Sequence, residues 1–126
     1  MKKDSKKKIL VVDDTPLMLR NMKNMLDQKY EVVLATSGRQ ALNIIPQENP
    51  DLVLLDYEMP EMDGKEVFEK MLDDPDMKEI PVVFLTSVSK RSSILSILKS
   101  KPAGYILKPA EQSNLLETIQ GILRNK

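Results

Sequence analysis

Five residues with reactive or charged side chains each follow a short apolar run in this 126-residue sequence. Asp13 and Asp14 follow the run at 9–12, Asp56 follows 52–55, Thr86 follows 82–85, and Lys108 follows 105–107. If these runs are strands of a parallel sheet, their carboxyl ends meet at one edge, where open α/β sheets bind ligands. The sequence therefore predicts one site that combines three carboxylates, a hydroxyl and an ammonium group.

The three carboxylates indicate a cation site. Carboxylates that converge repel one another unless a cation neutralises them. The sequence contains no His and no Cys, so the ligands are oxygens and the ion is hard: Mg²⁺, with Mn²⁺ or Ca²⁺ as alternatives. Lys108 and Thr86 add a point charge and a hydrogen-bond donor that suit a phosphoryl group. Together these groups predict phosphoryl transfer to a carboxylate nucleophile, which gives an aspartyl-phosphate.

The elements that must position these residues alternate between strands and helices. Strands are expected at 9–12, 32–34, 52–55, 82–85 and 105–107, and amphipathic helices follow each of them. Such a pattern predicts a parallel sheet with right-handed crossovers and helices on both faces. We expect a flavodoxin-like, doubly wound (βα)5 fold with strand order 2-1-3-4-5, which places the first strand in the centre.

Local signals place the helix boundaries and the apolar helix faces. Thr15 reads as an N-cap before Pro16, and Ser37 with Gln40 has capping-box spacing. Pro46 and Pro50 are expected to bound a loop, and 57–64 is expected to be another loop. The apolar faces are expected at Met18, Met22, Met25 and Leu26; at Val67, Phe68, Met71 and Leu72; at Ile94, Leu95, Ile97 and Leu98; and at Leu115, Leu116, Ile119, Ile122 and Leu123.

Composition excludes several classes of protein. Without His or Cys there is no Ser-His-Asp triad, thiolate site or disulfide. Residues 1–8 hold five Lys and one Asp, so the remainder carries a net charge of −4; with few aromatics, this argues against direct nucleic-acid binding. No apolar run approaches the length that a membrane-spanning helix needs, and no signal peptide is evident. We expect a cytoplasmic protein with a basic, flexible segment at 1–7 and a single domain at 8–126.

Six segments, in order, resemble the receiver domain of bacterial two-component response regulators. They are Lys8-Ile-Leu-Val-Val-Asp-Asp14, Leu52-Val-Leu-Leu-Asp56, Met59-Pro60, Met62-Asp63-Gly64, Pro81-Val-Val-Phe-Leu-Thr86-Ser87 and Gly104-Tyr105-Ile-Leu-Lys108-Pro109. Each segment alone is a weak signal, but the set at this spacing is highly specific. The resemblance covers essentially the whole chain.

The resemblance implies a role for each residue of the predicted site. Asp56 is the implied phosphoacceptor, and Asp13, Asp14 and Asp56 are the implied Mg²⁺ ligands, with the backbone carbonyl of Glu58 as a further ligand. Thr86 and Lys108 are implied to contact the phosphoryl oxygens, and the backbone N–H of Ser87 to cradle the group. The Lys108–Pro109 peptide bond is expected to be cis. Tyr105 matches the aromatic residue that changes rotamer when Thr86 moves.

The resemblance also implies partners and an output surface. The implied phosphodonor is a histidine kinase or a histidine phosphotransfer protein, and the implied target is a downstream protein or a fused output domain. The surface to consider for a partner or a homodimer is formed by the helix around 94–98, the strand at 105–107 and the last helix. It includes Lys99, Lys101, Tyr105 and Glu111. A carboxylate at Glu58 and an apolar Val88 predict slow self-dephosphorylation.

Two other classes of function compete with this interpretation. An aspartate-nucleophile phosphatase of the haloacid dehalogenase type would use a second Asp two residues after the nucleophile, where this chain has Glu58, and the chain is short for such an enzyme. A non-phosphorylated, flavodoxin-like binding module would need a phosphate-cradling loop after the first strand, where Asp13 and Asp14 would repel a phosphate. The signalling switch accounts for more of the residues than either alternative.

Overall fold

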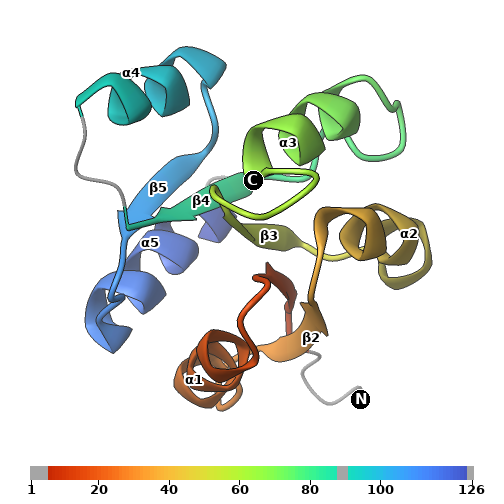
Figure 1. Cartoon of the computed structure of the whole chain (residues 1–126). Coiled ribbons are helices and arrows are strands. Elements are labelled where there is room, and N and C mark those ends of the chain that lie inside the picture. Colours follow the sequence, from red (N-terminus) through yellow and green to blue (C-terminus); the bar gives the residue numbers. More distant parts are fainter. Residues whose placement is uncertain (1–5, 88–90, 125–126) are drawn as a thin grey trace.

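The computed structural model describes residues 6–87 and 91–124 and shows one sheet of five parallel strands (Figure 1). The strand order is β2-β1-β3-β4-β5, which confirms the order predicted from the sequence. The strands are β1 (Lys8–Val12), β2 (Glu31–Ala35), β3 (Leu52–Asp56), β4 (Val82–Thr86) and β5 (Gly104–Leu107). The expected basic segment at 1–7 falls mostly outside the described residues, which include only its last two.

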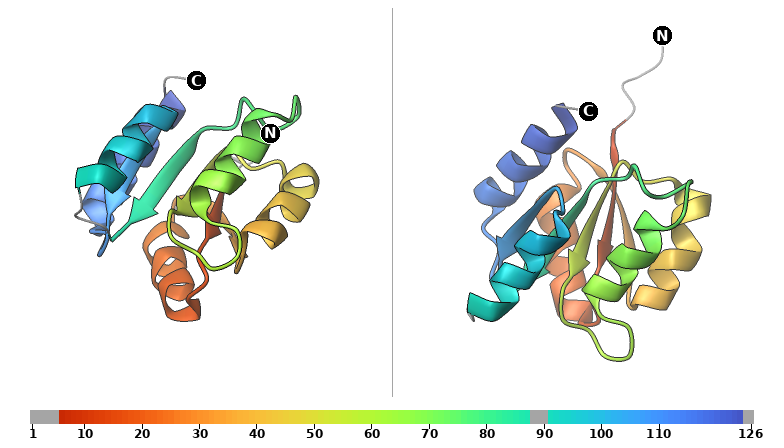
Figure 2. Two further views of the ribbon diagram at one scale, coloured as in Figure 1. Left: turned by 45° about the horizontal axis from the view of Figure 1, so that its top comes forward. Right: turned by 90° about the horizontal axis from the view of Figure 1, so that it is seen from above.

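Five helices cover the two faces of the sheet. They are α1 (Pro16–Leu26), α2 (Gly38–Glu48), α3 (Gly64–Leu72), α4 (Arg91–Ser100) and α5 (Gln112–Arg124). Figure 2 shows α1 and α5 on one side of the strands and α2, α3 and α4 on the other. Within the described residues, no helix is long and apolar enough to cross a membrane.

The sheet is buried on both faces, because successive strand residues point alternately into two separate apolar cores. On β1, Leu10 and Val12 pack with α2, α3 and α4, whereas Ile9 and Val11 pack with α1 and α5. All four side chains are fully buried. Burial of each such side chain contributes roughly 1.5–3 kcal/mol. The unbroken apolar runs of the sequence therefore fix the strand ends, and with them the positions of the polar residues that follow.

Capping places the starts of α1 and α2 where the sequence predicts them, whereas the start of α3 at Gly64 falls within the predicted loop. Thr15 is the N-cap of α1 and Pro16 its first residue, although the Thr15 side chain makes no capping hydrogen bond. The Ser37 hydroxyl accepts a hydrogen bond from the Gln40 amide at the start of α2. Asp63 caps α3 in the same way, through the amide of Glu66.

Several local predictions were wrong. Pro46 lies inside α2 instead of bounding a loop: the helix continues to Glu48 because Ala41 and Ile45 anchor it to the core, and Asn49 ends it in a left-handed conformation with φ 49°. On α1 the buried residues are Leu19, Met22 and Leu26, whereas Met18 and Met25 are half-buried.

The apolar faces of α3 and α4 are narrower than predicted. Leu72 ends α3 and is exposed, and Leu95 and Leu98 on α4 are exposed by 56% and 52%, so that Ile97 is the buried anchor of that helix. On α5 the predicted apolar face is confirmed: Leu115 and Ile119 are fully buried, and the half-buried Leu116, Ile122 and Leu123 pack against the same core.

Gly64, at the start of α3, lies against the backbone of the strand that carries Asp56. A Cβ atom at position 64 would lie 2.4 Å from the Asp56 carbonyl oxygen and 2.8 Å from the Tyr57 Cα. The Gly64 amide also donates to the Tyr57 carbonyl at 3.0 Å, which closes the loop after β3. Only a residue without a side chain permits this approach.

We predict that Gly64→Ala lowers the free energy of unfolding by about 1–3 kcal/mol, because a rigid backbone contact must give way. Gly121→Ala in α5 is the matched control: a Cβ atom there meets nothing within 4 Å, so a gain of up to about 1 kcal/mol is expected. Urea unfolding measures both variants. Equal stabilities would contradict the close packing at Gly64.

Candidate functional site: an acidic rim at the strand ends

The fold brings the sequence-predicted residues to one edge of the sheet. Asp13 follows β1 directly, Asp56 is the last residue of β3, Thr86 is the last residue of β4, and Lys108 follows β5. Because β1, β3, β4 and β5 are consecutive neighbours in the sheet, these four residues lie next to one another. We call this set, together with Asp14, the acidic rim.

A buried ion-pair network joins three of these groups. The Lys108 ammonium lies 3.0 Å from Asp13 Oδ2 and 3.2 Å from Asp56 Oδ1. Asp13 is fully buried and Asp56 is only 3% exposed. The other Asp13 oxygen, Oδ1, accepts a hydrogen bond from the Thr15 amide at 2.9 Å. The Asp13 carboxylate is thus fixed by the start of α1 on one side and by Lys108 on the other.

The electrostatics of the rim follow from this arrangement. Burial, together with the nearby charge of Asp13, raises the pKa of Asp56 from 3.8 to about 6, and the Lys108 ammonium offsets part of the rise. Burial alone would lower the pKa of Lys108, but its hydrogen bond to Asp13 and the charges of Asp56 and Asp13 outweigh burial and raise it. Without a further cation, the folded protein therefore holds Asp56 as an anion at a cost in free energy.

Asp13, Asp14 and Asp56 fit a hard divalent ion. One carboxylate oxygen from each residue lies within 4.8 Å of the others. Asp14 is exposed, which leaves the group open to solvent and to water ligands. The donors are all carboxylate oxygens, the set that Mg²⁺ and Mn²⁺ prefer. The Glu58 amide donates to Asp56 Oδ1 at 3.3 Å, so the backbone of Glu58 lies beside the same carboxylate.

Thr86 and Ser87 border the rim on its β4 side. Thr86 is fully buried, and its carbonyl accepts a hydrogen bond from the Lys108 amide at 2.8 Å, which ties the end of β4 to the residue after β5. The Lys108–Pro109 peptide bond is cis. Ser87 is exposed, and its hydroxyl lies 3.5 Å from Glu58 Oε1.

An aromatic cluster involves Tyr57, the residue after Asp56, and the sequence analysis missed it. The Phe84 ring packs edge-to-face against Tyr57 at 5.1 Å and against Phe68 at 5.4 Å. Tyr105 is half-buried, lies opposite Phe84 on the neighbouring strand and packs against the same core. The signal was present in the sequence, because Tyr57 directly follows Asp56 and Phe84 lies two residues before Thr86.

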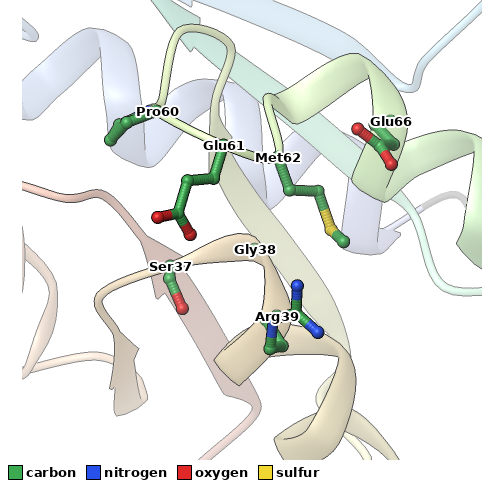
Figure 3. Close-up of a pocket in the computed structure, with 7 residues that line it drawn as sticks. All are labelled: Ser37, Gly38, Arg39, Pro60, Glu61, Met62 and Glu66. Atoms are coloured by element: carbon green, nitrogen blue, oxygen red, sulfur yellow. The ribbon is translucent and has the colours of Figure 1, made fainter.

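A separate hollow of about 260 Å³ lies between the start of α2 and the loop after β3 (Figure 3). Its lining residues are Ser37, Gly38, Arg39, Pro60, Glu61, Met62 and Glu66. None of them belongs to the acidic rim. The hollow is therefore separate from the strand ends, where the sequence predicts the chemistry.

Comparison with known proteins identifies related chains. A family model described as the response regulator receiver domain matches residues 9–120. The polar-differentiation response regulator DivK of Brucella ovis is 30% identical over 118 residues, which cover 93% of this chain and 96% of DivK. Response regulator PleD of Caulobacter vibrioides is 36% identical over 120 residues, which cover 94% of this chain but 26% of PleD.

Solved structures show the same fold. The chemotaxis protein CheY4 of Vibrio cholerae superposes with a TM-score of 0.86 at 28% identity and covers 94% of this chain and 99% of its own. The receiver domain of a signal transduction histidine kinase from Syntrophus aciditrophicus gives a TM-score of 0.87 at 29% identity, over 94% of this chain and 91% of its own.

We predict that Asp56→Asn stabilises the metal-free protein in EDTA at pH 8. The raised pKa of Asp56 means that its neutral form favours folding, and this contribution is lost as the pH rises from about 4 through about 6. The amide of the variant stays neutral at both pH values. Its free energy of unfolding should therefore exceed that of the wild type by on the order of 1–3 kcal/mol at pH 8, and by less at pH 5.

Urea unfolding at both pH values measures this difference. Asp73→Asn, which changes an exposed carboxylate at the end of α3, is the control and should shift stability little at either pH. An Asp56→Asn variant that is no more stable than the wild type at pH 8 would show that the rim tolerates the ionised carboxylate without cost.

Proposed function

The chain belongs to the response regulator receiver family of two-component signalling proteins, and we propose that it is a switch controlled by phosphorylation of Asp56. One observation carries the proposal: the Lys108 ammonium bridges the buried carboxylates of Asp13 and Asp56 beside the exposed Asp14. This arrangement holds a nucleophilic carboxylate next to a fixed positive charge and a set of hard ligands. A divalent ion and a phosphodonor would complete it.

The proposed donor is a phosphohistidine on a histidine kinase or phosphotransfer protein. An Asp56 carboxylate oxygen attacks phosphorus, an O–P bond forms, the N–P bond breaks, and its electron pair returns to the imidazole of the donor. Asp13 and Asp14, with Asp56 and the Glu58 carbonyl, would hold Mg²⁺ or Mn²⁺, which neutralises charge on the transferring group. Lys108, the Thr86 hydroxyl and the Ser87 amide contact the phosphoryl oxygens.

The phosphoryl group then changes a distant face through Thr86. It adds nearly two negative charges and strong acceptors to a packed rim, which draws Thr86 and Lys108 toward it. Tyr105, half-buried beside Phe84, then moves into the space near Thr86. The result is a population shift between two arrangements of α4, β5 and α5.

The α4-β5-α5 face has the character of a partner surface. Leu95, Leu98 and Leu107 are each exposed by 50% or more. Charged residues Lys99, Lys101 and Glu111 are exposed on the same three elements or next to them. The proposed occupant is a downstream protein, a fused output domain or a second copy of this chain. Among the relatives, the chain matches nearly all of DivK but a quarter of PleD, so both settings occur for such domains.

Receiver domains are signalling modules, and we propose that this chain catalyses only its own phosphorylation and dephosphorylation. A haloacid dehalogenase-type phosphatase is less well supported, because the residue two after the acceptor is Glu58, whose carboxylate is exposed and lies near Ser87. A flavin-binding module is less well supported because the loop after β1 begins with two carboxylates. The remaining alternative is a binding module whose acidic rim is assembled but is not phosphorylated.

We predict a single phosphoryl adduct, detected by intact mass, after incubation with acetyl phosphate and Mg²⁺. Asp56→Asn and addition of EDTA should each abolish it, since the first removes the nucleophile and the second the ion. Asp73→Asn should leave it unchanged. A folded wild-type protein that forms no adduct would favour the non-phosphorylated binding module.

We also predict that the phosphorylated protein decays slowly, with a half-life of minutes or longer. The Glu58 carboxylate hinders the attacking water, and Val88, which lies outside the described residues, offers no polar group to orient it. Loss of the adduct with time, after removal of acetyl phosphate in the presence of Mg²⁺, gives the half-life. Decay within a few seconds would contradict this expectation.

A further inference from the structure

Gln112, the first residue of α5, is bonded to the end of α1. Its side-chain amide donates to the Met25 carbonyl at 3.1 Å, and Met25 lies in the last turn of α1. Figure 2 shows both helices on the same face of the sheet, where their buried side chains share one core. The hydrogen bond therefore adds a polar link between two helices that also meet through apolar side chains.

This link closes a ring of contacts that includes the acidic rim. Lys108 binds Asp13 at 3.0 Å, and Asp13 accepts a hydrogen bond from the Thr15 amide just before α1. The other end of α1 is bonded to Gln112. Only residues 109–111 separate Lys108 from Gln112 in the sequence, so a displacement of Lys108 pulls on the start of α5.

The apolar packing of α5 opposes such a pull, whereas α4 is held less firmly. Leu115 and Ile119 of α5 are fully buried in the core that α5 shares with α1. Among the α4 side chains that the structure describes, at 94–100, Ile97 alone is fully buried. The two helices of the proposed output face are thus anchored to different degrees.

We infer that the Gln112–Met25 hydrogen bond is a tie that holds the start of α5 on α1 while Lys108 is displaced. Phosphorylation then rearranges α4 and the Tyr105 side chain, and α5 keeps its place. Gln112 is a positioning residue, because it acts through α5 and not on the reacting atoms. The inference rests on the proposed phosphorylation of Asp56 and states which part of the α4-β5-α5 face changes.

The tie divides the proposed output face into two parts of different chemistry. The exposed apolar side chains Leu95 and Leu98 belong to α4. The exposed side chains of α5 are all polar or charged: Gln112, Ser113, Asn114, Glu117 and Arg124. A partner would therefore meet the same polar surface in both states, and the apolar part of the face would change with phosphorylation.

Hydrogen exchange of backbone amides tests this division. The wild-type protein is compared in Mg²⁺ alone and in Mg²⁺ with excess acetyl phosphate, and intact mass gives the phosphorylated fraction. Phosphorylation should change the exchange rates of α4 amides at 94–100 by about threefold or more, since this helix has few buried contacts to lose. The amides at 115–119 of α5 should change by less than about twofold.

Gln112→Met tests the tie itself, because it removes the donor and keeps a side chain of similar length. In the unphosphorylated protein it should raise exchange at 115–119 about threefold to tenfold, the factor that corresponds to the loss of one hydrogen bond. On phosphorylation the same amides should then change further, since the start of α5 is free to follow Lys108.

Two controls isolate the effect of the tie. Asn114→Ala removes an exposed amide side chain from the same turn of α5 and should leave exchange at 115–119 unchanged. Lys6→Ala removes another side chain bonded near the end of α1, one that donates to the Asp27 carbonyl at 3.0 Å. It should raise exchange at the end of α1 and leave α5 as it was. Urea unfolding of each variant shows that the fold is retained.

The outcomes separate the inference from the proposed function. Equal changes in α4 and at 115–119 of the phosphorylated wild type would show that α5 is not held in place. A Gln112→Met variant that exchanges like the wild type, or an equal effect of Lys6→Ala at 115–119, would overturn the role of Gln112. If intact mass shows no phosphorylated wild type, the proposed function fails and the division of the face fails with it, whereas exchange of the unphosphorylated variants still decides whether the tie exists.

Discussion

The ion-pair network of Asp13, Asp56 and Lys108 sets the main constraint on this molecule. Two carboxylates are buried at the ends of adjacent central strands, where each raises the free energy of the other in its ionised form. Lys108 offsets part of that cost from the end of a third strand, at 3.0 and 3.2 Å. The sheet must hold the two carboxylates together against their mutual repulsion, and the two apolar cores supply the stability to do so.

The order of the strands and the identity of the rim residues could be predicted from the sequence. The strands β1, β3 and β4 are unbroken apolar runs, and a polar residue of the predicted site stands at the end of each, so the positions of Asp13, Asp56 and Thr86 could be predicted from the sequence. Contacts across the rim could not be predicted to the same degree. That Lys108 pairs with Asp13 as well as Asp56, and that Ser87 reaches Glu58, depends on loop paths and rotamers that no periodicity encodes.

The errors in the helix predictions have a common physical cause. Apolar periodicity indicates which side chains share a helix face, but the sheet decides how many of them it can cover. The helices α2 and α3 are well anchored, α2 over β1 and the five-residue strand β2, whereas α4 lies toward the edge strand β5, which has four residues. There Leu95 and Leu98 stay exposed although the pattern assigned them to the core. Pro46 shows the converse, since packing keeps α2 helical through a residue that normally ends a helix.

The same unequal packing supports the proposed coupling between the acidic rim and the α4-β5-α5 face. The carboxylates of the acidic rim lie at the ends of β1 and β3, whose side chains are fully buried in the two cores apart from Lys8 and Asp56. Among the α4 side chains that the structure describes, at 94–100, Ile97 alone is fully buried. Moving α4 therefore disturbs little buried apolar area, and segments with few such contacts rearrange at low cost.

In the proposed switch, a charge added at Asp56 meets strong resistance from the central strands and little from α4. The proposed displacement of Thr86 and Lys108 at the strand ends is therefore directed toward β5 and α4. The two features act together in the proposed switch. The buried carboxylates produce the electrostatic strain, and α4, which buries few side chains, is the helix that rearranges.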